Sequence, residues 1–315
     1  MVAEHALSGH QALSGQQYAI AAHGYEATIA SIGASLRTLT FEGRDLVVPF
    51  AADEVRPAYR GVTLAPWPNR VVDGRYRFGD VDEQLPLTEP DRGHALHGLA
   101  AWLDFTPLHR ESARVVLAAT IEAQAGYPHR LAIEVEFRVD AGGLHTSVKA
   151  TNVGPDAAPY GTGPHPYLVA GVGLVDDWTL TLPAAEVLEV TPDRLIPTGL
   201  APVDAPREGG SFDFRMPRRI GSTEIDHAFT GLAYDTDGEH GAVQVTVTDD
   251  GGRGVGMAWG RDCPWVQVHT ADGSGRSGLA VEPMTCPPDA FNSGTDLIVL
   301  EPGASTTAHW TIFGI

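Results

Sequence analysis

Apolar and polar side chains alternate along Leu131-Ala132-Ile133-Glu134-Val135-Glu136-Phe137-Arg138-Val139. The branched and aromatic residues of this stretch fall on one face of an extended chain, and its charged residues fall on the other. Ala141-Gly142-Gly143 then reverses the chain into Leu144–Val153, which alternates in the same way. Two such strands around a glycine turn indicate an antiparallel sheet with one face in a core and the other in solvent.

Short β-rich runs continue on both sides of this pair, separated by the turn signals His23-Gly24, Glu42-Gly43 and Asp73-Gly74. The expected strands are Gln17–Ala22, Tyr25–Ile32, Leu36–Phe41, Asp45–Phe50, Arg70–Val72, Arg75–Phe78, Val243–Thr248, Trp265–Thr270, Leu279–Val281, Leu297–Leu300 and Thr306–Phe313. Many short strands with little room for helices predict an all-β fold, a large antiparallel β-sandwich with few short helices. No fixed-period repeat or linker interrupts residues 1–315, so we expect a single domain.

Composition narrows the possible partners. The chain has 40 acidic and 21 basic residues and a net charge of −19, which disfavours nucleic acid and anionic membranes as partners. Lys149 is the only lysine, so Schiff-base and P-loop chemistry is improbable. Cys263 and Cys286 show neither metal-ligand spacing nor a disulfide framework, and we expect reduced thiols. Without an apolar membrane-length run or a secretory signal, the expected location is the cytoplasm.

Five irregular segments each carry a polar residue in an unusual setting. Arg70 follows the stiff turn Pro66-Trp67-Pro68-Asn69, and His97 lies three residues after His94. His165 stands between Pro164 and Pro166, which restrict the backbone to extended conformations and suit a rigidly held proton carrier. The other two polar residues are carboxylates: Asp226, which lies among apolar neighbours, and Glu282, which precedes Pro283.

Taken together, these motifs resemble the aldose 1-epimerase (galactose mutarotase) family from about residue 17 to the C-terminus. The matching pieces are Asn69-Arg70, Leu96-His97-Gly98 with Trp102 beyond, Gly163-Pro164-His165-Pro166-Tyr167, Asp226 with Phe229, and Glu282 with Pro288-Asp289-Ala290-Phe291-Asn292. Five motifs in the family's order are more specific than any one of them. The resemblance implies a galactose mutarotase-like supersandwich with a sugar in a concave cleft.

The resemblance also implies roles for these residues. Glu282 would take the proton of the anomeric hydroxyl and His165 would protonate the ring oxygen, which opens the pyranose of a free aldose such as glucose or galactose. The substrate-binding residues would be Arg70, His97, Asp226, Asn69 and Trp102. This chemistry requires no metal, nucleotide or other cofactor, and the only partner it implies is the sugar. Oligomeric state stays open.

Three alternatives stand beside this hypothesis. His94, His97 and His165 could form a zinc site, although HxxH on a loop is a weak signal. A hexose-phosphate epimerase of the same fold would use arginines around the phosphate, and Arg215, Arg218 and Arg219 cluster in sequence. A non-catalytic sugar-binding domain is the third, and the presence of both Glu282 and His165 disfavours it.

The motifs also depart from those of the better-known galactose enzymes. Met284 and Thr285 follow the Glu282-Pro283 pair, and a single glycine, Gly98, follows His97 where those enzymes often have two. The chain could therefore belong to a side branch of the family, and the preferred aldose is left open.

Overall fold

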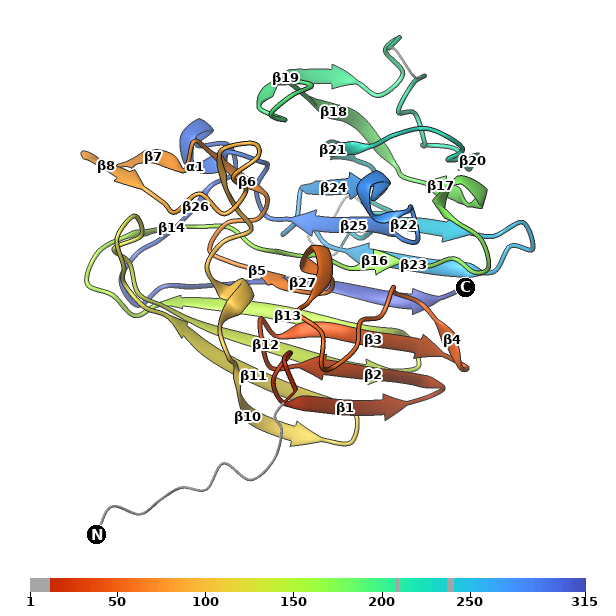
Figure 1. Cartoon of the computed structure of the whole chain (residues 1–315), viewed down its shortest axis with the longest axis horizontal. Helices are drawn as coiled ribbons and strands as arrows, with labels where there is room; N and C mark the ends of the chain where they lie inside the picture. Colours follow the sequence, from red (N-terminus) through yellow and green to blue (C-terminus); the bar gives the residue numbers. More distant parts are fainter. Residues whose placement is uncertain (1–11, 208–209, 237–240) are drawn as a thin grey trace.

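The computed structural model describes residues 12–207, 210–236 and 241–315 (Figure 1). Its regular structure is almost entirely antiparallel β-sheet, as the alternation predicts. The one α-helix of the described residues, α1, spans only Ala290–Ser293. Four single-turn 3₁₀ helices accompany it: η1 (Pro57–Tyr59), η2 (Ala100–Trp102), η3 (Val175–Asp177) and η4 (Asp272–Ser274). None of the helices in the described ranges is long and apolar enough to cross a membrane.

The largest sheet has nine strands and contains the alternating strand pair around Ala141-Gly142-Gly143. Its order is β10 (Thr106–Glu111), β11 (Arg114–Ile121), β12 (Leu131–Asp140), β13 (Gly143–Asn152), β27 (Ser305–Gly314), β23 (Gly254–Trp259), β22 (Val243–Thr248), β17 (Thr179–Thr181) and β20 (Arg218–Arg219). Every second residue of β12 is buried. The C-terminal strand β27 is inserted between β13 and β23, so the two halves of this sheet are joined by a long-range pairing.

Two further sheets complete the framework. A six-stranded sheet runs β16 (Tyr167–Leu168), β25 (Leu279–Met284), β24 (Trp265–His269), β21 (Asp226–Leu232), β18 (Ala184–Val190) and β19 (Pro197–Pro202). A four-stranded sheet runs β1 (Gln17–Ala22), β2 (Tyr25–Ala30), β3 (Ser35–Phe41) and β4 (Arg44–Asp45), and it packs beside β11–β13 (Figure 1, red). Their inward side chains join one hydrophobic cluster with those of the nine-stranded sheet, which builds a large β-sandwich.

Short two-stranded ladders connect these sheets and carry several site residues. They are β14 (Ala158–Tyr160) with β26 (Ile298–Leu300), β15 (Gly163–Pro164) with β5 (Thr63–Leu64), β6 (Arg70–Val72) with β9 (His94–Leu96), and β7 (Arg75–Phe78) with β8 (Val81–Gln84). Cys263 and Cys286 are both free thiols, and both are buried.

Two local expectations are corrected. Of the expected strand at 45–50, only Asp45 is paired in β4, because the segment after it crosses to the six-stranded sheet, where Val48 N–H donates to Tyr167 O at 2.8 Å. Asp73-Gly74 is a tight turn with φ of 56° and 60°, but the strands it joins pair elsewhere. The hairpin at His23-Gly24 is confirmed, with Ala22 opposite Tyr25.

Candidate active site

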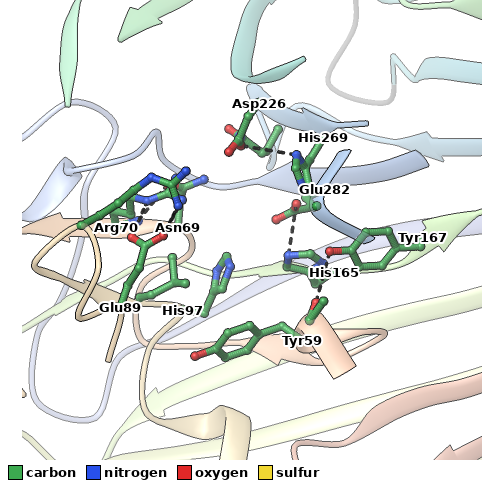
Figure 2. A pocket seen from close by; sticks show the side chains of 15 residues that line it. Tyr59, Asn69, Arg70, Glu89, His97, His165, Tyr167, Asp226, His269 and Glu282 are labelled. Atoms are coloured by element: carbon green, nitrogen blue, oxygen red, sulfur yellow. Dashed lines mark hydrogen bonds and ion pairs between the residues drawn. The ribbon is translucent and has the colours of Figure 1, made fainter. Parts of the chain in front are cut away.

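A pocket of about 300 Å³ opens between the six-stranded sheet and the loops around it (Figure 2). Its size is at the lower end of the range of small-molecule sites, about 300–1,000 Å³, and suits a single sugar ring. Its lining residues are Ala58, Tyr59, Asn69, Arg70, Glu89, Arg92, Leu96, His97, His165, Tyr167, Asp226, Gln267, His269, Gly273 and Glu282. Histidines, carboxylates and arginines dominate this list, so the pocket suits a polar ligand.

One face of the six-stranded sheet forms a wall of the pocket. Across β21, β24 and β25 the register sets Asp226 opposite His269, and Gln267 opposite Glu282. Because side chains alternate along a strand, Gln267 and His269 project from the same face, together with Glu282 and Tyr167 of neighbouring strands. Gln267 Nε2 donates to Asp226 Oδ1 at 2.7 Å, which orients that carboxylate.

His165 and Glu282 face each other inside the pocket, with Nε2 of the imidazole 3.5 Å from Oε1 of the carboxylate (Figure 2). His165 follows β15, and its backbone is fixed on both sides: its N–H donates to Val62 O at 3.1 Å, and Gly61 N–H donates to its carbonyl at 2.8 Å. The flanking prolines therefore do frame a rigid imidazole. Its Nδ1 and the Oε2 of Glu282 are buried without a hydrogen-bond partner in the described chain.

Burial sets the protonation of this pair. Desolvation, followed by the charge of His269, lowers the pKa of His165 from 6.5 to about 3. Desolvation also raises the pKa of Glu282 well above its usual value; Asp226 adds to the rise, and Arg70 opposes it. The two groups therefore share one proton, which burial alone places on Glu282.

Arg70 begins β6 on the opposite side of the pocket and is nearly buried. Its Nε and one terminal nitrogen donate to the two carboxylate oxygens of Glu89 at 2.8 and 2.9 Å, and its other terminal nitrogen donates to Asn69 Oδ1 at 3.3 Å. Asn69 has a left-handed backbone, with φ of 55°, and its carbonyl accepts the N–H of His97 at 2.8 Å. One stretch of chain thus fixes both Arg70 and His97.

His97 lies between the two sides of the pocket (Figure 2). Its ring stands nearly perpendicular to that of His165, with centroids 4.9 Å apart, and the ring of Tyr59 packs on it at 4.7 Å. Burial, with the charges of His165 and Arg70, lowers the pKa of His97 well below its usual value. A neutral His97 with an unpartnered buried Nδ1 can exchange a hydrogen bond with a sugar oxygen.

Six of the seven residues expected in the site line this pocket: Glu282, His165, Arg70, His97, Asp226 and Asn69. Trp102 does not line it. Its side chain is 55% exposed, lies under the guanidinium of Arg56 at 4.5 Å, and reaches only Tyr59, at a centroid distance of 6.3 Å. Trp102 is therefore one ring removed from the pocket, and Tyr59, which lines the pocket, packs near both Trp102 and His97.

His94 is removed from the zinc hypothesis by its hydrogen bonds. Its Nδ1 accepts the N–H of Asp73 at 3.2 Å and its Nε2 donates to Arg194 O at 2.8 Å, so both ring nitrogens bind backbone. Within the described ranges, no group of three His, Cys, Asp or Glu side chains is arranged to hold a metal ion.

Several pocket residues were not singled out from the sequence: Tyr59, Glu89, Arg92, Tyr167, Gln267 and His269. For Gln267 and His269 a signal existed, because alternation along 265–270 places both on one face of an expected strand. Glu89 comes from a loop and Tyr59 from the single-turn helix η1, and the positions of both depend on tertiary contacts that no local pattern marks.

Several known proteins resemble this chain over much of its length. A family model described as aldose 1-epimerase matches residues 16–312. The uncharacterized Escherichia coli (strain K12) protein YihR is 39% identical over 302 residues, which cover 96% of this chain and 94% of that protein. Galactose mutarotase of Mus musculus is 29% identical over 222 residues, 66% of this chain and 62% of the mouse protein.

Solved structures show the same fold. The GalM/aldose epimerase homologue from C. elegans matches with a TM-score of 0.82 at 21% identity, covering 95% of this chain and 98% of that one. Galactose 1-epimerase from Lactobacillus acidophilus matches with a TM-score of 0.74 at 20% identity, covering 92% of each chain. At such identities the likeness concerns the fold alone.

Proposed function

Because the chain belongs to the aldose 1-epimerase family, we propose that it interconverts the α and β anomers of a free aldose such as glucose or galactose. The observation that carries this proposal is the buried His165–Glu282 pair, 3.5 Å apart in a pocket of single-sugar size. Mutarotation needs one group to accept the anomeric proton and one to protonate the ring oxygen, and this pair supplies both. No cofactor takes part in the proposed reaction.

The protons exchanged by His165 and Glu282 match those that the reaction requires. In the empty site the shared proton lies on Glu282, so sugar binding must first move it to His165. As the bond between C1 and the ring oxygen breaks, the Glu282 carboxylate then gains the anomeric proton and His165 gives its proton to the ring oxygen. Ring opening thus leaves a neutral acid and a neutral imidazole, which is the state that burial favours through the pKa shifts of both groups. After the aldehyde rotates, closure on its other face returns both protons. The open-chain intermediate therefore meets the pair in its preferred state.

Sugar binding would come from the remaining lining groups. The free N–H groups of Arg70, the Asp226 carboxylate held by Gln267, and neutral His97 can pair with hydroxyls of the ring. Tyr59 offers an aromatic wall beside His97. These groups bind the substrate in both anomeric forms, and only the His165–Glu282 pair acts on the reacting atoms.

The phosphorylated-sugar alternative receives no support from the arginine cluster on which it rested. Arg215 is paired with Asp204 and Asp213, Arg219 with Asp177 and Asp250, and neither lines the pocket. Arg218 lies over the ring of Phe214.

Polarimetry on freshly dissolved α-anomers of common hexoses and pentoses tests the proposal, with hexose 6-phosphates as a separate arm. We expect faster equilibration for at least one free aldose. Glu282→Gln and His165→Asn should each lower kcat by about 10²–10⁴-fold, the usual contribution of a positioned acid or base. Glu134→Gln, which removes a half-exposed partner of Lys149, is the control and should be normal. Equilibration no faster than in buffer for every free aldose would refute the assignment, and a sugar-binding domain would then be the better hypothesis.

A further inference from the structure

The Arg70–Glu89 contact is a nearly buried, two-point ion pair beside the sugar pocket. The two side chains are only 10% and 12% exposed, and both carboxylate oxygens of Glu89 accept N–H groups of the guanidinium. A guanidinium has about five N–H donors. The fork with Glu89 and the bond to Asn69 use three of them, so two remain available to the pocket.

We propose that Glu89 is a positioning residue of this site, which holds Arg70 so that its remaining N–H groups face the hydroxyls of the bound sugar. The inference rests on the proposed function and deepens it. Arginine is a long side chain that loses considerable rotamer entropy when it is fixed. If Glu89 fixes it before the sugar arrives, that cost is not charged against binding.

Glu89 can act as a rigid support because its own loop is tightly closed. Its N–H donates to His94 O at 3.0 Å, and its carbonyl accepts the N–H groups of Gly93 and His94 at 2.8 and 3.2 Å. The carboxylate therefore starts from a backbone that is anchored to β9, the strand paired with the one that carries Arg70.

The charges around Glu89 support the same role. Burial would raise the pKa of Glu89, but its bonds to Arg70 and then to Arg92 outweigh burial and lower it. Arg92 reaches Glu89 Oε1 at 3.0 Å from the solvent side. Glu89 is thus ionised at neutral pH, and it partly neutralises the one buried cation that also faces Asp226 and Glu282.

The first test compares Glu89→Gln with Glu122→Gln. Glu122 forms the same two-point fork with Arg130, at 2.7 and 3.0 Å, but on the exposed surface away from the pocket. We expect Glu89→Gln to raise KM about 10-fold with little change in kcat, since Arg70 binds substrate and transition state alike. Glu122→Gln should leave both constants unchanged. A Glu89→Gln protein with a lower Tm but normal KM would show that the fork is only structural.

A double-mutant cycle separates action through Arg70 from independent action. If Glu89 works by positioning Arg70, the KM of Arg70→Gln/Glu89→Gln should equal that of Arg70→Gln alone. Two effects on KM that multiply would overturn the inference, because Glu89 would then contact the sugar independently.

A readout without turnover keeps this inference separate from the proposed function. In ¹⁵N-labelled protein, the Nε–H signal of Arg70 should be sharp and slowly exchanging in the wild type and should broaden or exchange faster in Glu89→Gln. The Arg130 signal should respond only to Glu122→Gln. If the wild type accelerates no sugar, the proposed function fails but the Arg70 signal still decides whether Glu89 positions that side chain; an unchanged signal in Glu89→Gln would refute the positioning role.

Discussion

His165 must carry a proton in a place that disfavours its charge. It is nearly buried, and the groups around it are two more imidazoles, His97 and His269, the Glu282 carboxylate, and the cations Arg56 and Arg70. The carboxylate 3.5 Å from its Nε2, that of Glu282, is itself shifted toward the neutral form. The empty site therefore holds a neutral pair, and a bound sugar has to supply hydrogen bonds that make proton exchange with the ring favourable.

This environment predicts a pH-dependent stability difference for His165→Asn. Because the folded pKa of about 3 lies below the unfolded value of 6.5, His165 contributes stability above pH 6.5 that is lost as the pH falls toward 3. The unfolding free energy of the wild type should thus fall relative to that of His165→Asn between these values, with a slope approaching about 1.4 kcal/mol per pH unit. Urea denaturation at intervals of pH measures it.

Glu282→Gln should change the pH dependence of the unfolding free energy in the opposite direction. A raised carboxyl pKa contributes stability below the unfolded value of 4.5 that is lost as the pH rises through the folded value. The unfolding free energy of Glu282→Gln should therefore rise relative to that of the wild type as the pH increases. If the unfolding free energies of the wild type and both variants changed with pH in the same way, burial would not shift the pKa of either group.

At the residue scale, sequence motifs identified the groups whose neighbours in the chain are distinctive. Six of the seven expected residues line the pocket, among them His165 between its two prolines. Trp102 was misplaced because a motif gives order along the chain and not the direction of a side chain. Glu89 and Tyr59 were missed because their roles come from contacts with Arg70 and His97, which are distant in sequence.

The elements that hold the catalytic pair meet at a close backbone contact. Gly163 of β15 lies against β25, and a Cβ on it would stand 2.5 Å from Pro283 O and 3.3 Å from Met284 Cγ. Pro283 and Met284 are the two residues after Glu282, and Gly163 is two residues before His165. The 3.5 Å separation of the pair therefore depends on the absence of a side chain here.

Gly163→Ala should consequently lower both stability and kcat. Pushing β15 away from β25 should cost about 1–3 kcal/mol in unfolding free energy, the usual penalty for overpacking. The same displacement separates His165 from Glu282, so kcat should fall further than the stability loss alone explains. Gly142→Ala is the control: it lies in the β12–β13 turn, where the nearest atom is the flexible Asp140 carboxylate at 3.2 Å. A Gly163→Ala protein that is destabilised but has a normal kcat would show that the contact does not set the pair.

Strand positions were predictable where the pattern is local. The stretch at 131–139 lies in β12, and the hairpins at His23-Gly24 and Glu42-Gly43 form as expected. The expected strand at 45–50 was wrong because Leu46 and Val47 are buried in succession, which breaks alternation, and their partners lie in the distant β16 region. Local pattern shows that a chain is extended, and tertiary contacts decide what it pairs with.

At the scale of the molecule, the sequence indicated an all-β sandwich but not its sheet order. The insertion of β27 between β13 and β23 joins residues far apart in the chain, and no periodicity encodes that choice. The described lining residues of the pocket come from the six-stranded sheet, the β6–β9 ladder, the short helices η1 and η4, and loops. The nine-stranded sheet contributes a core and no lining residue among them.

That division predicts that core damage in the nine-stranded sheet separates stability from function. Val148 is fully buried in β13, between Val135 and Ala308 on the neighbouring strands. Val148→Ala should lower the unfolding free energy by about 2 kcal/mol, from lost burial and the cavity left behind. Because the pocket is built elsewhere, kcat per folded molecule and KM should stay at wild-type values. A raised KM in fully folded Val148→Ala would instead mean that packing in this sheet is transmitted to the wall that holds Glu282, and that the two layers act as one mechanical unit.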